Sequence, residues 1–433
     1  MSPDIQAAPL DPTLIEPAAL QERLEAAFAR VPRKHVVVAV SGPSGRCYAA
    51  VSSRHGVDRD PGEWTFATGC ITKLLTATLV LDAVEAGAVR LHDGVASLLG
   101  RAGGPGALAG VTVRHLLEHT HGIADPPFGR APLRANGRVD VEELLRSVGD
   151  RTRWPAGALY SYSDVGPWLA AAIVERVWDA GFADLLRERL PGGLECAATR
   201  PAGAPPFACA SRGGGLALGV RGLIGFLERA LAGPTFHASC DVAGHRITPL
   251  PGWSVAERGI YLGWKYFGEG WYGHNSVMPL ASLLVRTHPR SGTVLLIASR
   301  GHPASLVAAK LFARSLPELK NLVIPRPLPA ERAAALDPMS YCGSYSTGSR
   351  RLSIQLVDRT LVLRGDGFRA ALVPAGRELF FAKPPKLGRP AYVQLLHGSP
   401  EGFRHLWDGQ QLLHNLGIRG PCPSAAGARE PAA

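Results

Sequence analysis

Apolar positions along the chain change between two periods, and these predict helices and strands in a definite order. Residues 17–31 repeat their apolar positions with helical spacing. Residues 35–42 are a β-branched run that ends in glycine, which predicts a strand, and residues 47–53 are its expected hairpin partner. Residues 70–89 are apolar on nearly every side, so we expect about five turns of helix at the centre of the core.

Helical patterns continue through the middle of the chain and give way to strands near residue 258. A short helix is expected within 111–125, ending at His121-Gly122, where glycine can adopt the left-handed cap. Further helices are expected within 139–150, 164–190 and, after the strands of 258–300, within 305–316. Helices between an N-terminal hairpin and later strands predict an antiparallel sheet whose first and last strands pair.

A second, smaller unit follows a proline-rich stretch. Residues 324–338 are typical of a linker. Short strands then recur about every ten residues, which predicts a small antiparallel barrel or sandwich; they are expected at 341–347, 351–358, 360–365, 370–376, 378–382, 392–398 and 402–409. We therefore expect an α/β (α+β) chain with a main domain over 1–323 and a small β-domain over 339–433.

Composition narrows the class of protein. The chain has 433 residues, of which 46% are hydrophobic, so it can bury a large core. It contains neither a long uncharged apolar stretch nor a signal-peptide pattern, so we expect a cytoplasmic protein that binds no membrane. Its seven cysteines show no CxxC or Cys/His ligand spacing, which argues against structural zinc and a disulfide framework.

The net charge of +11 favours acidic partners. A nucleic acid is disfavoured because the chain has no block of five or more basic residues and no RNP or zinc-finger pattern. An acidic carrier protein remains a possible partner.

Cys70 and Lys73 are the first candidate for chemistry. Residues three apart are neighbours on one helix face. A helix N-terminus and a nearby ammonium both favour the thiolate form of cysteine, which is the nucleophile. Taken alone, however, a cysteine on an apolar helix is more often a packing residue.

Five ordered motifs between about residues 66 and 300 resemble those of the serine β-lactamase and penicillin-binding-protein superfamily, in particular the class C-like serine hydrolases and esterases. Cys70 stands at the serine of the Ser-x-x-Lys motif in "FATGCITKLL", and "VTVRHLLEHTHGI" matches a second landmark. "WPAGALYSYSDVG" supplies Tyr162 but has Asp164 where asparagine is usual. "GGGLALGVRGLIGFLERAL" is the fourth motif, and "GWYGHNSVMP" offers His274 with Ser276 in place of glycine. The segment after residue 338 resembles the small β-barrel that follows many such hydrolases.

The resemblance implies a β-lactamase-like domain and a role for each matched residue. Cys70 would attack a carbonyl, while Lys73 and Tyr162 would move protons. The backbone N–H groups of Cys70 and Val277 would hold the oxyanion, at about 3 kcal/mol per donor. We expect the substrate pocket to be lined by Tyr160, Trp271, Asn275 and Ser276.

Two departures from the family pattern change the expected chemistry. A carboxylate at Asp164 should keep Lys73 protonated, which leaves proton transfer to Tyr162 or His274. We hypothesise a triad of Cys70, His274 and Asp164, since thiolates are usually paired with an imidazole. The side chain of Ser276 should narrow the pocket, which argues against β-lactam binding.

A cysteine nucleophile suits acyl transfer between thioesters. Exchange from a phosphopantetheine thioester onto Cys70 is nearly thermoneutral, and a thioester then reacts readily with amines. We expect an amide-forming acyltransferase that takes its acyl group from an acidic acyl or peptidyl carrier protein, or from coenzyme A, and passes it to a small amine acceptor. The chain is similar in size and in its cysteine to the amide-condensing enzymes of lincosamide antibiotic assembly. No tightly bound cofactor is expected.

Two other functions remain open. A thioesterase or esterase would use the same nucleophile with water, and an inactive binding module would keep the scaffold alone.

His115, His119 and His121 lie within one landmark and are expected to make structural hydrogen bonds, so we expect no metal site.

Overall fold

The computed structural model describes most of both predicted units. The described residues are 10, 14–31, 35–53, 60–100, 106–125, 132–134, 137–149, 154–189, 216–233, 259–278, 281–316, 319, 338–347, 350–365, 367–376, 378–383, 392–399, 402–407 and 412–415. The predicted linker of 324–338 and the boundary at 323 fall almost entirely outside them. No helix in this part of the chain is both long and apolar enough to cross a membrane.

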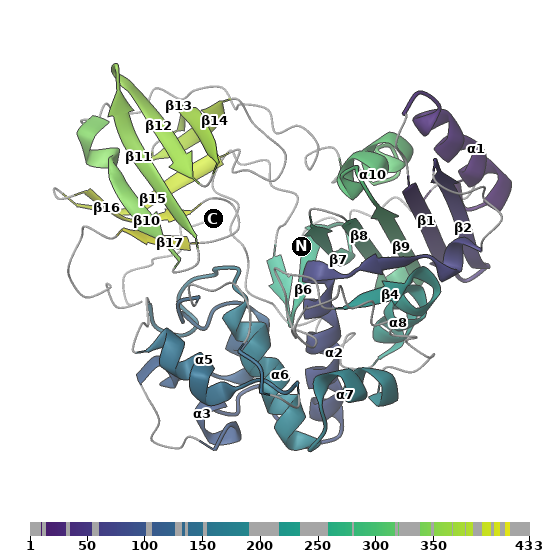
Figure 1. Cartoon of the computed structure of the whole chain (residues 1–433), viewed down its shortest axis with the longest axis horizontal. Helices are drawn as coiled ribbons and strands as arrows, with labels where there is room; N and C mark the ends of the chain where they lie inside the picture. Colours follow the sequence, from purple (N-terminus) through teal and green to yellow (C-terminus); the bar gives the residue numbers. More distant parts are fainter. Residues whose placement is uncertain are drawn as a thin grey trace, which may run out of the picture.

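A seven-stranded antiparallel sheet organises the main domain (Figure 1). Its order is β2-β1-β9-β8-β7-β6-β5. The strands are β1 His35–Gly42, β2 Gly45–Ser52, β5 Gly259–Tyr261, β6 Trp264–Gly268, β7 Trp271–Val277, β8 Ser282–His288 and β9 Thr293–Ser299. Val36 of β1 lies opposite Ser299 of β9, so the first strand pairs with the last, as the sequence predicts.

Helices cover both faces of this sheet. One face packs on α1 (Pro17–Phe28) and α10 (Ala304–Phe312). The other carries the larger core, to which the remaining helices contribute; these are α2 Thr72–Glu85, α3 Val95–Leu98, α4 Val113–Leu117, α5 Val141–Val148, α6 Val165–Val177, α7 Phe182–Arg189 and α8 Val220–Ala232. Because both faces are buried, β1 and β9 are apolar along most of their length, and β8 is buried throughout.

Two helices end earlier than the sequence predicts. The helix of Cys70 starts as a 3₁₀ turn, η3 (Gly69–Ile71), continues as α2 and ends at Glu85, because Gly87 takes a φ of +71°. Helix α4 ends at Leu117 because His119 already adopts a left-handed φ of 54°. The chain therefore runs from His119 to Asp125 as a loop, and this loop forms one wall of the site described below.

The C-terminal unit is a closed antiparallel barrel, which decides between the predicted barrel and sandwich. Its strands are β10 Gly343–Ser346, β11 Arg351–Val357, β12 Thr360–Gly365, β13 Phe368–Gly376, β14 Leu379–Lys383, β15 Tyr392–Ser399, β16 Gly402–Trp407 and β17 Leu412–Asn415. The last of these was not predicted, because four residues show too little alternation. Pairing of β17 with β10 closes the barrel around a core that includes Tyr345, Leu363 and Leu395.

Candidate active site

Cys70 lies in the η3 turn between β3 (Thr65–Ala67) and α2 and is half-buried. Gly69 precedes it with a φ of +49°, and a Cβ there would come within 2.3 Å of the Ser276 hydroxyl. The hydroxyl of Thr68 holds the turn by bonds to Thr72 Oγ1 (2.8 Å) and to the backbone carbonyl of Leu216 (3.0 Å). The turn therefore needs glycine at position 69 to bring Cys70 close to β7.

Lys73 lies one turn further along and forms a buried ion pair with Asp164. Its Nζ is 2.5 Å from Asp164 Oδ1, and the lysine side chain is 2% exposed. Burial would lower the pKa of Lys73, but the negative charges of Asp164, Cys70 and Asp125 outweigh burial and raise it. Lys73 is therefore an ammonium group, as the sequence predicts, and not a free base.

Tyr162 lies against two lysine side chains. Its ring centroid is 4.8 Å from Nζ of Lys73 and 4.6 Å from Nζ of Lys265. Burial raises the pKa of Tyr162 well above its ordinary value, and the charges of Cys70 and Asp164 and a hydrogen bond with the Cys70 thiol raise it further. Tyr162 is therefore a neutral phenol in contact with the nucleophile.

His274 on β7 is neutral and has one unused nitrogen. Its Nδ1 bonds to the backbone carbonyl of Asn275 at 2.7 Å, whereas its buried Nε2 has no partner among the described residues. Burial lowers the pKa of His274 well below its ordinary value, and the charges of Lys265 and Lys73 lower it further. With the proton on Nδ1, Nε2 is an acceptor whose ring lies 5.7 Å from that of Tyr162.

The hypothesised triad of Cys70, His274 and Asp164 is not formed. Asp164 is bonded to Lys73, and the nitrogen of His274 that a triad carboxylate would hold is bonded to a backbone carbonyl. An ammonium attracts the carboxylate more strongly than a neutral imidazole does. In this structure the thiol of Cys70 interacts with the phenol of Tyr162.

The two expected oxyanion donors differ in their availability. Met278 and Ala281 exchange both backbone hydrogen bonds at the end of the β7–β8 hairpin. Bonded and non-bonded pairs alternate along antiparallel strands, so the N–H of Val277 points away from β8. On the other edge of β7, strand β6 pairs only up to Gly273, so it does not pair with Val277. The Cys70 N–H instead donates to the hydroxyl of Ser276 at 3.2 Å, so that side chain occupies half of the expected oxyanion hole.

Trp271 and Asn275 are not in the substrate pocket, contrary to expectation. Successive residues of a strand point to opposite faces, and His274 and Ser276 take the face toward Cys70. Trp271 packs in the core beneath α1 and α10, and Asn275 Oδ1 accepts a hydrogen bond from Arg286 Nη1 at 2.9 Å. Tyr160 is buried with its ring edge-on to His119.

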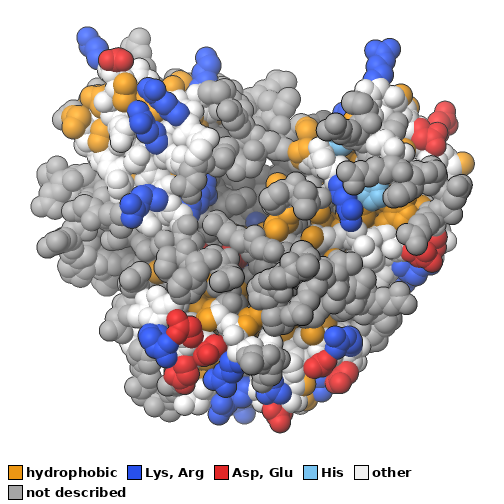
Figure 2. Space-filling model, viewed as in Figure 1, with side chains coloured by type: hydrophobic (Ala, Val, Ile, Leu, Met, Phe, Trp, Pro, Cys, Tyr) orange, Lys and Arg blue, Asp and Glu red, His pale blue; other side chains and the backbone are white. Residues whose placement is uncertain are grey.

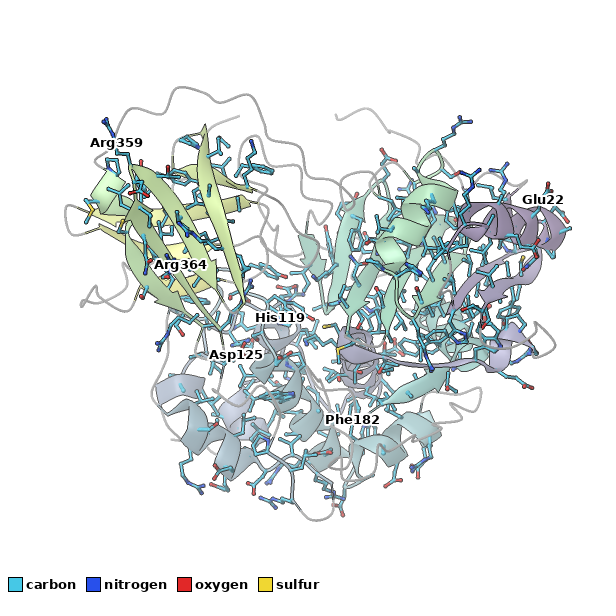
Figure 3. All side chains as sticks on the ribbon, turned by 45° about the horizontal axis from the view of Figure 1, so that its top comes forward. Glu22, His119, Asp125, Phe182, Arg359 and Arg364 are labelled. Carbon is cyan, nitrogen blue, oxygen red and sulfur yellow. The ribbon has the colours of Figure 1, made fainter. Side chains whose placement is uncertain are left out.

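A small cavity adjoins Tyr162. Residues of the main domain and one residue of the barrel line it: Ile123, Ala124, Asp125, Trp154, Ser161, Tyr162, Ser163 and Thr347. Figure 3 shows His119 and Asp125 at the place where the barrel, the sheet and the helices approach one another. Asp125, Lys265 and Thr347 were not predicted from the sequence as site residues. A carboxylate after the "HTHGI" landmark and a lysine in the apolar "YLGWKYFG" run were available signals for the first two.

Asp125 is a buried carboxyl group that, like Asp164, interacts with the positive charge of Lys73. Its Oδ1 accepts hydrogen bonds from the backbone N–H groups of Asp164 (3.1 Å) and Val165 (3.3 Å), at the start of α6. Burial raises its pKa to about 7, and the charge of Asp164 adds to this increase. Asp125 therefore changes protonation near neutral pH, and it is hydrogen-bonded to the backbone of Asp164, the partner of Lys73.

The three histidines of the second landmark make structural hydrogen bonds, as the sequence predicts. Nδ1 of His115 accepts from the N–H of Thr112 and caps α4. Nδ1 of His119 accepts from Ser163, and Nδ1 of His121 accepts from Ile123. The bond from Ser163 N–H to His119, together with the bond between His121 Nε2 and the Ser163 hydroxyl (2.7 Å), ties the loop after α4 to the "YSYSD" segment and so positions Tyr162.

Comparison with known proteins gives one family and several relatives. A family model described as Beta-lactamase matches residues 18–315. Penicillin-binding protein 4 of Amycolatopsis lactamdurans is 28% identical over 379 residues, which covers 75% of this chain and 96% of that protein.

Solved structures extend the likeness to the barrel. SurE in complex with D-Leu is 23% identical with a TM-score of 0.69, covering 93% of this chain and 99% of that chain. The D-amino acid amidase from Ochrobactrum anthropi SV3, complexed with D-phenylalanine, is 18% identical with a TM-score of 0.55, covering 70% and 99%. At these identities the two structures show the fold alone.

The raised pKa of Asp125 predicts that stability falls as pH rises from about 4 to about 7. The folded state holds the Asp125 proton up to about pH 7, whereas an unfolded aspartate loses it near pH 3.9. The native state therefore binds more protons in this window, and the free energy of unfolding decreases by at most about 1.4 kcal/mol per pH unit. Asp125→Asn keeps the oxygen that accepts both backbone bonds and should remove this part of the slope, measured by urea denaturation at each pH.

Asp140→Asn is the matched control, because Asp140 also accepts a backbone bond at a helix start, from Glu143. A slope that is the same in wild type and Asp125→Asn would contradict the assignment of the titration to Asp125.

The bond between Ser276 and Cys70 N–H predicts that Ser276→Gly speeds acylation. An oxyanion must displace the Ser276 hydroxyl, and a neutral hydrogen bond of about 1 kcal/mol corresponds to about fivefold in rate. The burst of nitrophenolate from p-nitrophenyl acetate measures acylation of Cys70. Ser344→Gly, on an exposed position of β10, is the control. Slower acylation of Ser276→Gly would mean that the hydroxyl itself stabilises the oxyanion.

Proposed function

Because the chain belongs to the beta-lactamase family, we propose that it is an acyl-transferring enzyme whose nucleophile is the thiol of Cys70. Its donor is an acyl thioester of phosphopantetheine, carried by an acidic carrier protein or by coenzyme A. Its acceptor is a small amine, and the product is an amide. The reaction belongs to the assembly of natural products such as antibiotics.

The observation that carries this proposal is the surroundings of Cys70. The thiol is half-exposed, and it lies close enough to the phenol of Tyr162 and to the ammonium of Lys73 to influence the pKa of both. A cysteine that only packs in the core has no need of these two proton-bearing groups. Each of them stabilises a thiolate, because both place positive charge or an O–H donor against sulfur.

The reaction follows from these groups in two steps. In the first, the Cys70 thiolate attacks the thioester carbonyl, the C–S bond of the donor breaks, and the departing pantetheine thiolate takes a proton from Tyr162. In the second, the amine attacks the acyl-cysteine, the new C–N bond forms and the Cys70 thiolate leaves. The amine proton passes to Tyr162 or to the unused Nε2 of His274. Val277 N–H, with Cys70 N–H once Ser276 has moved, holds the oxyanion in both steps.

Sulfur favours transfer over hydrolysis in this scheme. Exchange of one thioester for another conserves the free energy of the acyl group, and thioesters react readily with amines. The competing function is hydrolysis, because the comparisons include an amidase. SurE and the amidase are described with D-amino acids, so D-aminoacyl thioesters are the first donors to test.

Intact-protein mass spectrometry should find a D-aminoacyl adduct on Cys70 after incubation with a D-alanyl N-acetylcysteamine thioester. Cys70→Ala should give none, and Cys70→Ser should lose most of the amide-forming activity, because its ester reacts less readily with amines. Adding an amine should yield amide in preference to free acid, measured by liquid chromatography. Free acid as the main product would identify a hydrolase, and an unlabelled Cys70 would indicate a binding module.

Replacing His274 separates its role from that of Tyr162. If Nε2 receives the amine proton, His274→Ala should slow aminolysis of the acyl-enzyme by about 100-fold or more and leave acylation unchanged. Tyr162→Phe should slow both steps, because the phenol also protonates the leaving thiolate. Rapid-mixing kinetics of each step provide the measurement. A pH-rate profile of His274→Ala that coincides with that of wild type would remove His274 from the mechanism.

A further inference from the structure

Three arginines lie together on the outer face of the barrel, and the proposed reaction does not use them. Arg364 of β12 lies directly opposite Arg369 of β13 and, on its other side, opposite Ser353 of β11. Arg351, two residues before Ser353, is therefore a diagonal neighbour of Arg364. All three side chains are exposed. We refer to Arg351, Arg364 and Arg369 as the barrel-rim arginines.

The charge of this face is uncompensated within its strands. Strands β10 to β14 contain no aspartate or glutamate, and the acidic residues between them in the sequence are Asp358, Asp366 and Glu378. Like charges directly opposite each other on adjacent strands destabilise a sheet. Lys and Arg predominate over acidic groups on the visible face of the barrel (Figure 2). Repulsion between these arginines lowers the stability of the isolated chain, and the binding of an anionic partner would relieve it.

The barrel-rim arginines are at the end of the barrel that reaches the active-site cavity. Thr347, which follows β10, lines that cavity. Ser346 points outward, because its neighbour Tyr345 is in the barrel core, yet Ser346 is only 7% exposed. Ser346 lies opposite Arg351 on the same face. The face thus begins at the cavity and continues into solvent at Arg351 and Arg364.

Figure 3 agrees with this placement. Arg364 is at the end of β12 nearer to His119 and Asp125, and Arg359, in the turn that precedes β12, is at the far end. Adjacent strands are about 4.8 Å apart, so the three arginines extend across about 10 Å of the rim. This width is suited to one acidic helix or to the phosphate of a pantetheine arm.

We propose that the barrel-rim arginines are the docking surface for the acidic carrier protein that delivers the acyl thioester. The inference rests on the proposed function, and it adds where the donor binds. A carrier held there would direct its pantetheine arm along the turn of Thr347 toward Tyr162 and Cys70. Charge complementarity of this kind acts mainly on the association rate and on partner choice.

The test compares one acyl group on two carriers. The donors are D-alanyl-phosphopantetheine on an acidic peptidyl carrier protein and the same D-alanyl group on N-acetylcysteamine, which needs no docking surface. Arg364→Glu and the double variant Arg351→Glu/Arg364→Glu reverse charge at exposed positions. We expect the KM for the carrier-bound donor to rise by about tenfold or more in the double variant. The kcat/KM for the small thioester should change by less than about twofold.

Arg359→Glu is the matched control for Arg364→Glu, because it makes the same charge change on the same barrel at the end away from the cavity. A KM for the carrier-bound donor that is unchanged in the double variant, or that rises equally in Arg359→Glu, overturns the proposal. Fluorescence anisotropy of the labelled carrier gives a reading that does not require turnover. Salt-sensitive binding that the double variant loses supports docking even if neither donor is turned over, whereas absence of binding to the wild type at 50 mM salt or less overturns it.

Discussion

The buried ion pair between Lys73 and Asp164 acts together with burial to set the protonation of the groups around Cys70. An ammonium group removed from water needs a close counter-charge, and Asp164 provides it at 2.5 Å. The pair leaves Lys73 charged, and that charge helps to keep His119 and His274 neutral. The carboxylate of Asp164 in turn holds the proton on Asp125 and on Tyr162. The site therefore contains proton donors and a fixed positive charge, but no strong base next to the nucleophile.

This constraint explains why sulfur and a carboxylate occur together. A serine hydroxyl is a poor nucleophile unless a neighbouring base takes its proton. A thiol ionises much more easily, so stabilisation of its anion is sufficient. Asp164 in place of asparagine removes Lys73 as a base, and Cys70 in place of serine makes that base unnecessary. In the proposed reaction, the departures from the family pattern at Cys70 and Asp164 are thus one chemical change.

Local patterns were sufficient to predict most of the fold, and the ordered motifs predicted which residues surround Cys70. The β-branched runs and turn signals placed the first and last strands side by side, which the pairing of β1 with β9 confirms. The errors in the site residues have two causes. Trp271 and Asn275 are next to site residues in sequence but on the opposite face of β7, and periodicity alone does not say which face meets Cys70. Asp125 and Thr347 enter the site only through tertiary contacts between distant segments.

In the proposed reaction, the barrel adds a specificity for the donor that the thiol of Cys70 lacks. Sulfur determines how an acyl group is taken and released, but it does not distinguish one thioester from another. Discrimination between donors requires contacts with the part of the donor that does not react. Thr347 is the barrel residue found in the wall of the cavity, and the exposed arginines follow it on the same rim. In the proposed reaction, a donor that reaches Tyr162 along this wall passes the barrel, which selects the carrier while the main domain performs the chemistry.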